Sequence, residues 1–333
     1  MSKKNIAVIG CGISSAAFYH FIDKDKFNIT FFEKSRGVGG RMSAKRIDNL
    51  SFDHGASCFG AIRSEAFTSF IDSYIKEGVV KEWQGRFRIF DLKSNQSSDI
   101  ERKKRLISAF RSNYLAKRIL HKAIECEKII FNEKVVNLDF DNDQKINIIC
   151  DSGSIYNNFD YVVSSAPAPQ TLQFFPKEFI FRAMLTKVEY DPAFAVMLSF
   201  KRDKKIDFSH LAIKNSIISR ISYENSKDDR NFELDCFVIN STNDYSIKYI
   251  NNDLSSIEND IINEFIKITN LDKNNIINKK THRWLYANAK KSYDMPPLFD
   301  QKLSIAAIGD YIKGPRVELS FESGQEMAEL LNF

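Results

Sequence analysis

The sequence of 333 residues predicts a mixed α/β protein, and three observations near its start support this prediction. Ile6–Ile9 and Phe27–Phe32 are apolar runs of the kind that form strands buried on both faces of a sheet. Between them, Gly10–Gly12 allows a tight turn, and apolar residues then recur at helical spacing over Ile13–Ala17. The second run ends at Glu33. A strand, a helix and a second strand in this order predict a βαβ unit.

The two glycines of the turn predict a binding site for a dinucleotide. Because Gly10 and Gly12 lack β-carbons, backbone N–H groups at the start of the helix can approach a pyrophosphate. We therefore expect contacts from these two residues and from Ile13 and Ser14. The third position of the G-x-G-x-x-G fingerprint holds Ser15, which is small enough for the helix and the strand to pack closely. The unit is interpreted as Rossmann-type.

Glu33 stands where such folds place the carboxylate that binds ribose hydroxyls, and a second glycine cluster follows it. Gly39 and Gly40 would let the backbone pass close to the cofactor, while Arg36 and Arg41 would supply fixed cations for its phosphates. A surface turn with solvated charges is the alternative. A nicotinamide-binding unit, however, does not need a second glycine cluster directly after the acidic strand.

The next stretch predicts a helix over Ala66–Ile75, whose apolar residues share one face, and a strand over Trp83–Phe90, which alternates imperfectly. Ser94–Ser98 is predicted as a polar turn. Glu101–Ile124 is predicted as one basic helix with an apolar face, and its basic flank is interpreted as solvated rather than as a membrane or nucleic-acid contact.

The remaining elements follow the same two periodicities. In order, they are a β meander over Lys128–Asn132, Lys134–Phe140 and Lys145–Cys150, a buried strand over Tyr161–Pro167, sheet strands over Ala193–Phe200 and Phe232–Ile239, an amphipathic helix opened by the capping box Ser255–Glu258, a returning segment Lys279–Ala287, a buried strand over Leu303–Ile308, and a last helix opened by Gly314–Glu318. Gly324 and Ala328 lie four residues apart in that helix and permit close packing.

Composition favours an enzyme for anionic ligands. Lys and Arg exceed Asp and Glu by 48 to 43, an excess too mild for a nucleic-acid-binding protein. The five cysteines are scattered and lack a C-x-x-C pair, which argues against a disulfide framework and against a metal site, so a reducing cytoplasm is expected. No stretch approaches the roughly 18 apolar residues that span a membrane, and glycines interrupt the apolar run after Lys3 and Lys4, unlike a signal peptide.

The stretch from Glu33 to Arg41 resembles, with one more residue between Arg36 and the glycine pair, the E-x-x-R-x-G-G-R motif of flavoproteins with two dinucleotide-binding domains, which include the amine oxidases. Lys34–Arg46 is similar to the diagnostic stretch of bacterial renalase-like FAD-dependent oxidoreductases. Further segments resemble bacterial renalase in the same order over nearly the whole chain: Asp53–Phe59, Ser164–Gln170, His282–Ala287, Gly309–Asp310, Arg316–Glu318 and Ser323–Ala328.

The resemblance implies two domains and noncovalent FAD. The Rossmann-type FAD-binding domain, similar to that of p-hydroxybenzoate hydroxylase, would comprise residues 1–75, 127–175 and 280–333. An α+β substrate domain built on a mixed sheet would comprise residues 76–126 and 176–279. The Gly309–Asp310 region contains no cysteine for a thioether link to the cofactor.

The resemblance also implies where the cofactor binds. The backbone of the loop around Ala56 and Ser57 would lie beside the flavin ring, and the strand at Val136 would hold the adenine edge. Asp310 resembles the carboxylate that binds the ribityl and pyrophosphate region, and the helix that begins near Arg316 would direct its positive end toward the flavin. Further cofactor contacts are expected from Lys34, Ala166, Gly309 and Val317.

The implied activity is hydride transfer from an isomeric 2- or 6-dihydro form of NAD(P) to flavin N5, with reoxidation by O2 to give H2O2 and NAD(P)⁺. Trp284 and Tyr286 are candidates for an aromatic wall against the nicotinamide, with core packing as the alternative. Asn240 stands where a bacterial renalase stretch has a His; it cannot titrate near neutral pH but can bind a carboxamide. His54 and Cys58 are interpreted as packing residues. The alternatives are a flavin amine oxidase or desaturase acting on another small molecule, and a flavin-binding protein without turnover.

Overall fold

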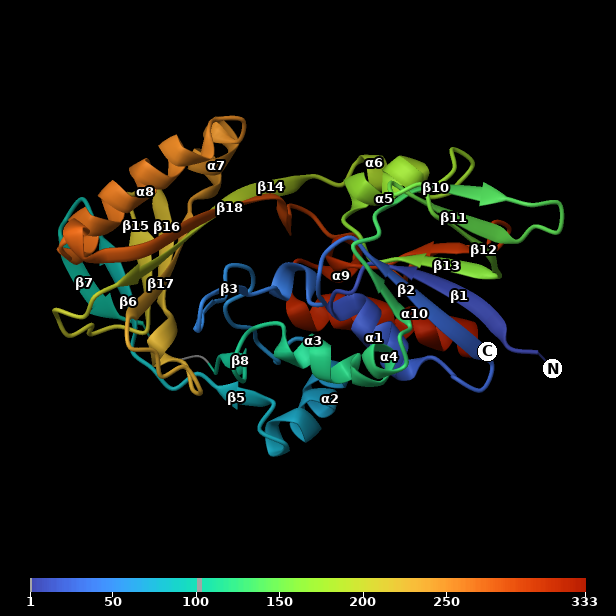
Figure 1. The fold of residues 1–333 in the computed structure, drawn as a ribbon, viewed down its shortest axis with the longest axis horizontal. Helices are drawn as coiled ribbons and strands as arrows, with labels where there is room; N and C mark the ends of the chain where they lie inside the picture. Colours follow the sequence, from blue (N-terminus) through green and yellow to red (C-terminus); the bar gives the residue numbers. More distant parts are fainter. Residues whose placement is uncertain (1, 101–103) are drawn as a thin grey trace.

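The computed structural model of the chain describes residues 2–100 and 104–333 and shows two lobes (Figure 1). One lobe holds both chain termini and is built on a six-stranded sheet, whereas the other is built on a seven-stranded sheet. Two long neighbouring strands of the second sheet, β14 (Tyr190–Phe200) and β18 (Ile276–Ala289), extend toward the first lobe. The predicted α/β class, with a second sheet-rich part, is confirmed.

The six-stranded sheet has the strand order β19-β20-β13-β1-β2-β9. Its strands are parallel except for β19, which runs antiparallel to β20. The bounds are β1 (Lys4–Ile9), β2 (Phe27–Glu33), β9 (Ile129–Phe131), β13 (Tyr161–Ser164), β19 (Leu298–Asp300) and β20 (Ile305–Ala307). Ile6–Ile9 is buried throughout, because structure covers both faces of this sheet.

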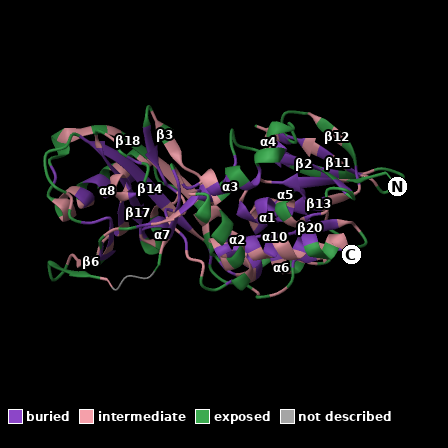
Figure 2. Ribbon diagram, turned by 90° about the horizontal axis from the view of Figure 1, so that it is seen from below, coloured by how far each residue is buried: buried purple, intermediate pink, exposed green. Residues whose placement is uncertain are grey.

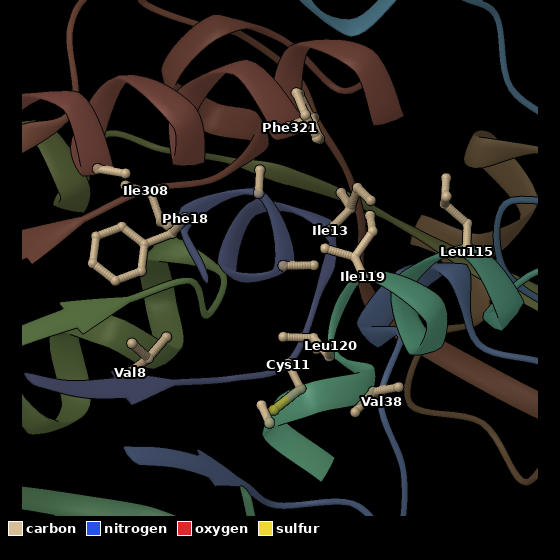
Figure 3. Packing of buried hydrophobic residues seen from close by; sticks show 14 of the residues in the cluster. Val8, Cys11, Ile13, Phe18, Val38, Leu115, Ile119, Leu120, Ile308 and Phe321 are labelled. Carbon is tan, nitrogen blue, oxygen red and sulfur yellow. The ribbon is translucent and has the colours of Figure 1, made fainter. Parts of the chain in front are cut away.

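On one face of the sheet, α1 (Ile13–Phe21) lies against α10 (Val317–Asn332). The two helices approach closely at Gly324, where an added Cβ would lie 1.9 Å from the carbonyl oxygen of Ser14. Phe18, Ile308 and Phe321 belong to the core between these elements (Figure 3). The close packing predicted for the last helix is thus confirmed at its glycine.

The opposite face is covered by a three-stranded antiparallel meander and two short helices, α5 (Ala168–Phe174) and α6 (Arg182–Thr186). The meander consists of β10 (Val135–Phe140), β11 (Ile146–Cys150) and β12 (Ile155–Phe159). Two of the segments predicted for it, Lys134–Phe140 and Lys145–Cys150, form β10 and β11, whereas the third, Lys128–Asn132, is wrong because it pairs in parallel with β2 as strand β9. The two faces of each parallel strand therefore contribute to two separate cores.

The seven-stranded sheet has the order β18-β14-β17-β16-β15-β6-β7 and is mixed, because β15 and β6 pair in parallel and the other neighbours are antiparallel. The further bounds are β6 (Phe87–Asp91), β7 (Gln96–Asp99), β15 (His210–Lys214), β16 (Ile218–Tyr223) and β17 (Asp235–Ser241). Its outer face is covered by α8 (Leu254–Thr269), which buries Ile257, Ile261 and Phe265, and by the shorter α7 (Asn243–Tyr249). Its inner face is turned toward the first lobe (Figures 1 and 2).

Between β2 and β9 the chain forms small elements that lie between the lobes or below the first sheet in Figure 1. They are η1 (Gly40–Met42), β3 (Lys45–Ile47), β4 (Leu50–Phe52), α2 (Glu65–Lys76), β5 (Val80–Glu82), β8 (Leu106–Ser108), α3 (Tyr114–Ile119) and α4 (His121–Glu125). Val80 and Leu115 pack into the same core as Ile13, although they lie in a segment that we predicted as part of the substrate domain. The proposed domain bounds stay a prediction.

The single basic helix predicted over Glu101–Ile124 is wrong within the described residues, and residues 101–103 lie outside them. Leu106–Ser108 forms strand β8, which pairs antiparallel with β5, and two short helices follow only from Tyr114. Phe110 has a left-handed backbone with φ 60°, which a continuous helix cannot contain. Pairing with β5 thus overrode the local helical spacing.

Three smaller predictions are also corrected. The strand predicted from Trp83 begins only at Phe87, and the predicted polar turn Ser94–Ser98 contributes three residues to edge strand β7. Helix α8 is capped by Asp253 rather than Ser255, because the Asp253 carboxylate accepts from the N–H groups of the two residues after Leu254.

Two 3₁₀ turns, η2 (Glu224–Ser226) and η3 (Lys273–Asn275), and the four-residue α9 (Asp310–Lys313) complete the fold. Over residues 2–100 and 104–333, none of the helices has the length and apolar character that crossing a bilayer requires.

Candidate active site

The first glycine turn leaves open space at the start of α1. Gly12 is the N-cap of this helix, and no atom would lie within 4 Å of a Cβ added there. The first N–H groups of a helix, here those near Ile13 and Ser14, have no intrahelical partners and carry a positive partial charge, so an anion fits beside them. Gly10 has φ 93°, and a Cβ there would lie 2.7 Å from Ser165 Oγ. Glycine is therefore required at this turn.

Ser15 takes the third fingerprint position without disturbing the turn. It is buried, and its hydroxyl donates to the carbonyl oxygen of Gly12 at 2.9 Å. Its side chain thus bonds within its own helical turn instead of separating the helix from the sheet.

The second glycine cluster folds back onto the first. Gly39 N donates to Cys11 O at 2.8 Å, and a Cβ on Gly40 would lie 3.3 Å from Gly12 Cα. Gly39 has φ 126°, and a Cβ on it would lie 2.6 Å from Asn113 Cβ. The structure therefore brings together two motifs that the sequence separates by more than a strand, and glycine is needed at both.

The buried Glu33 carboxylate lies at the same edge of the sheet. One carboxylate oxygen accepts from Cys11 N and the other from Ser35 N, each at 2.8 Å. A carboxylate can accept about four hydrogen bonds, so it retains capacity for further donors. Nearby, Glu133 N donates to Glu33 O at 3.1 Å, and the bulge in β10 leaves Val136 between paired residues, with its side chain exposed.

Other predicted cofactor residues lie around this edge. A Cβ on Gly10 would lie 3.8 Å from Ala166 N, which places Ala166 beside the first turn. Lys34 and Arg36 are exposed, and Lys34 Nζ donates to Gln170 Oε1 at 3.2 Å. Arg36 follows on the same exposed stretch.

Arg41 and Asp310 meet in a bidentate ion pair with N–O distances of 2.6 and 2.7 Å. Burial opposes the charged form of Arg41, but the adjacent Asp310 carboxylate raises the pKa of the guanidinium overall. Asp310 also accepts from Tyr190 OH at 3.2 Å. The carbonyl oxygen of Arg41 accepts from Ala56 N at 2.9 Å, so the loop that continues to the buried Ser57 is attached to the same centre.

The beginning of α10 lies beside the turn formed by Ile62 and Arg63. Arg316 is its exposed N-cap and Val317 its first helical residue. In the first turn, the buried Glu318 carboxylate accepts from Ile62 N and Arg63 N. This helix end therefore holds the turn after the Ala56 loop, while Gly309 precedes α9 with φ 143°.

Across from these residues, three rings form a cluster on the inner face of the seven-stranded sheet. His54 stacks on Trp284 with centroids 5.3 Å apart, and His282 contacts both rings at 4.8 and 4.3 Å. Trp284 Nε1 donates to His54 O at 3.0 Å. Burial, aided by His282, lowers the pKa of His54 to about 4, so the imidazole is neutral at pH 7. A neutral, stacked His54 is consistent with a packing role.

Asn240 lies in line with this cluster. Strand register places His282 opposite Ala195, Ala195 opposite Asn240, and Asn240 opposite Arg220. Arg220 Nε donates to Asn240 Oδ1 at 3.0 Å. Tyr286, the third predicted catalytic residue, lies nearer the first lobe. Its ring lies 5.6 Å from that of Tyr190, which bonds to Asp310.

Sequence reasoning missed a buried group of four charges between the lobes. Asp53 and Glu224 each pair with both Lys227 and Arg230, and the four side chains are at most 1% exposed. Asp53 also accepts from Ser112 N at 2.8 Å. Lys227 and Arg230 stand in a charged, polar stretch that looks like a surface loop, so the one signal in the sequence is that Asp53 begins the renalase-like segment Asp53–Phe59.

Comparison with known proteins identifies the same first unit and the same fold. Residues 8–74 match the family described as an NAD(P)-binding Rossmann-like domain. A candidate protoporphyrinogen oxidase from Exiguobacterium is 13% identical, with a TM-score of 0.77 over 100% of this chain and 99% of that one. A reduced UDP-galactopyranose mutase is 12% identical, with a TM-score of 0.75 over 99% and 94%. A putrescine oxidase bound to putrescine is 10% identical, with a TM-score of 0.72 over 99% of both chains.

Proposed function

We propose that this chain is an FAD-dependent oxidoreductase. The site fits this cofactor on three counts. Open space lies at the start of α1 beside Gly12, buried Glu33 has acceptor capacity left for ribose hydroxyls, and the unpaired position at Val136 leaves backbone groups for an adenine edge. The Rossmann-like match over residues 8–74 covers the first two of these features, and two of the structurally similar proteins are described as oxidases.

Within that class, we propose the renalase type, in which the donor is a 2- or 6-dihydro isomer of NAD(P). FAD, when bound, supplies a hydride acceptor and passes the electrons on to O2, giving H2O2. The protein's task is then to position the donor. The partly exposed Trp284, which stacks on the buried His54, would offer an aromatic surface to a nicotinamide ring, and Asn240 an amide to its carboxamide.

One observation carries the proposal. The ring cluster at Trp284 is joined through one short loop to the glycine cradle, which is the pair of turns at Gly10–Gly12 and Gly39–Gly40. Ala56 N is bonded to Arg41 O, next to the second glycine cluster, and His54 in that loop stacks on Trp284. A cofactor in the cradle and a flat substrate on the ring cluster would thus meet over residues 54–57. Proximity and orientation are the protein's main contribution to hydride transfer.

Anaerobic titration tests the proposal. The purified yellow protein is mixed with dihydro-NAD isomers prepared by borohydride reduction, and the visible flavin absorbance is followed. Rapid bleaching is expected. Bleaching only by amines such as putrescine would favour an amine oxidase, and no bleaching by either would favour a flavin-binding protein without turnover.

The mode of FAD attachment is tested separately. Because no cysteine lies at Gly309–Asp310, acid precipitation is expected to release intact FAD into the supernatant. Colour that stays in the pellet would contradict noncovalent binding.

A further inference from the structure

Arg220 is a cation without a carboxylate partner among the residues that the structure describes. Its guanidinium is half-buried and donates through Nε to Asn240, and no described acid lies within ion-pair distance. Burial lowers the pKa of Arg220, and the neighbouring Arg105 lowers it further, while the thiol of Cys58 acts in the opposite direction. A partly desolvated charge without a counter-ion is costly, and an anionic ligand beside Arg220 would remove that cost.

The charged groups around Arg220 cannot neutralise its guanidinium. The two buried acids of this region, Asp53 and Glu224, are each bonded to both Lys227 and Arg230. His210, one strand away on β15, is kept neutral because burial, Arg105 and Arg220 lower its pKa to about 3. The inner face of the sheet is therefore positive around Arg220.

The position of Arg220 relates it to the ring cluster. It belongs to the cross-strand row that contains His282, Ala195 and Asn240, and the next residue of the row, on β15, is Ala212. Three inter-strand steps separate His282 from Arg220, or about 14 Å. Ala195 is buried, whereas His282 and Arg220, at the two ends of this stretch, are partly exposed. The row therefore suits an elongated ligand with a ring at one end and an anion further along.

We propose that Arg220, oriented by Asn240, binds the diphosphate of the substrate while its nicotinamide lies on the Trp284 ring. Nε is engaged by Asn240, which leaves the two terminal nitrogens to form the paired hydrogen bonds that arginine makes with phosphate oxygens. This inference rests on the proposed function, since it identifies the substrate as a phosphate-bearing dihydronicotinamide rather than a small amine.

The kinetic test compares two donors: a dihydro-NAD isomer, and the corresponding dihydronicotinamide riboside, which lacks phosphate. Arg220→Gln is expected to lower kcat/KM for the dinucleotide by about 10- to 150-fold, the range for a lost hydrogen bond to a charged group. The riboside should change by less than about threefold. Arg220→Lys should fall between, because the ammonium keeps the charge but not the fork. The matched control is Arg202→Gln, at an exposed arginine paired with Asp235, and it should behave as wild type. Equal losses for both donors would overturn the inference.

A binding test separates this inference from the proposed function. ADP-ribose and inorganic pyrophosphate are titrated calorimetrically into the oxidised holoenzyme, wild type and Arg220→Gln. Weaker binding of both by the variant supports the anion site even if dihydronicotinamides fail to reduce the flavin, in which case only the proposed function is lost. Unchanged binding overturns the anion site even if the flavin is reduced.

Thermal unfolding supplies a third measurement. The Tm of Arg220→Gln should equal or exceed that of wild type. A clear fall in Tm that Arg220→Lys shares would show that Arg220 has a structural role and would overturn the inference.

Discussion

Glu224→Gln is expected to destabilise the protein strongly, because it leaves a buried positive charge unpaired. In the wild type, Asp53 and Glu224 balance Lys227 and Arg230, with Asp53 Oδ2 at 2.9 Å from Lys227 Nζ and Glu224 Oε1 at 2.8 Å from the same nitrogen. Glu224 Oε2 also accepts from Asp53 N at 3.1 Å. The amide keeps the shape and loses the charge.

The magnitude follows from burial. The four side chains are at most 1% exposed, so solvent cannot compensate for the lost charge. Removing one partner of a buried ion pair costs about 3–5 kcal/mol. At roughly 2 °C per kcal/mol in a chain of this size, the Tm should fall by about 6–10 °C.

Calorimetry or circular dichroism on thermal unfolding measures the effect. The matched control is Glu258→Gln, whose partner Lys279 is half exposed, and the expected loss there is about 1 kcal/mol or less. The double variant Glu224→Gln/Lys227→Met restores neutrality and should recover part of the loss. A Tm for Glu224→Gln within 2 °C of wild type would refute the view that these charges depend on one another.

Further predictions concern acid stability and the two ligand sites. The cationic partners of Asp53 outweigh the effect of burial and lower the pKa of its carboxyl group from 3.8 to about 2, so the ionised carboxylate stabilises the fold above about pH 4. Some 2–3 kcal/mol of the free energy of unfolding should be lost between pH 4 and 2. Urea unfolding should show this loss for the wild type but not for Asp53→Asn. Glu33→Ala should weaken FAD binding by roughly 1.5–3 kcal/mol, and an unchanged Kd for FAD in a fluorescence titration would contradict the assignment of Glu33 to the cofactor site. Gly39→Ala should yield protein without FAD, because its Cβ meets Asn113, and full yellow colour after purification would argue against this. Trp284→Ala should keep FAD but slow flavin reduction by about 100-fold in stopped flow. A variant that folds but is colourless would instead show that Trp284 contacts FAD.

Local rules predicted much of the first lobe. The buried runs that became β1 and β2, the turn at Gly12 and the buried Glu33 follow from hydrophobic pattern and glycine chemistry, which act over a few residues. Two strands of the meander, β10 and β11, and the amphipathic face of α8 were predicted for the same reason. The helix over Glu101–Ile124 failed where a partner strand, β5, provided better pairing than the local helical pattern.

The amino-acid pattern was sufficient to predict the α/β class, the two glycine clusters and the acidic strand end, because each depends on the conformational freedom or the polarity of neighbouring residues. The contacts between distant residues could not be predicted in this way. Strand register places Arg220 opposite Asn240, and the packing of the two lobes places Lys227 in an ion pair with Asp53. These contacts depend on how sheets and loops pack, and a charge in a polar stretch carries no local signal that it will be buried beside its partner.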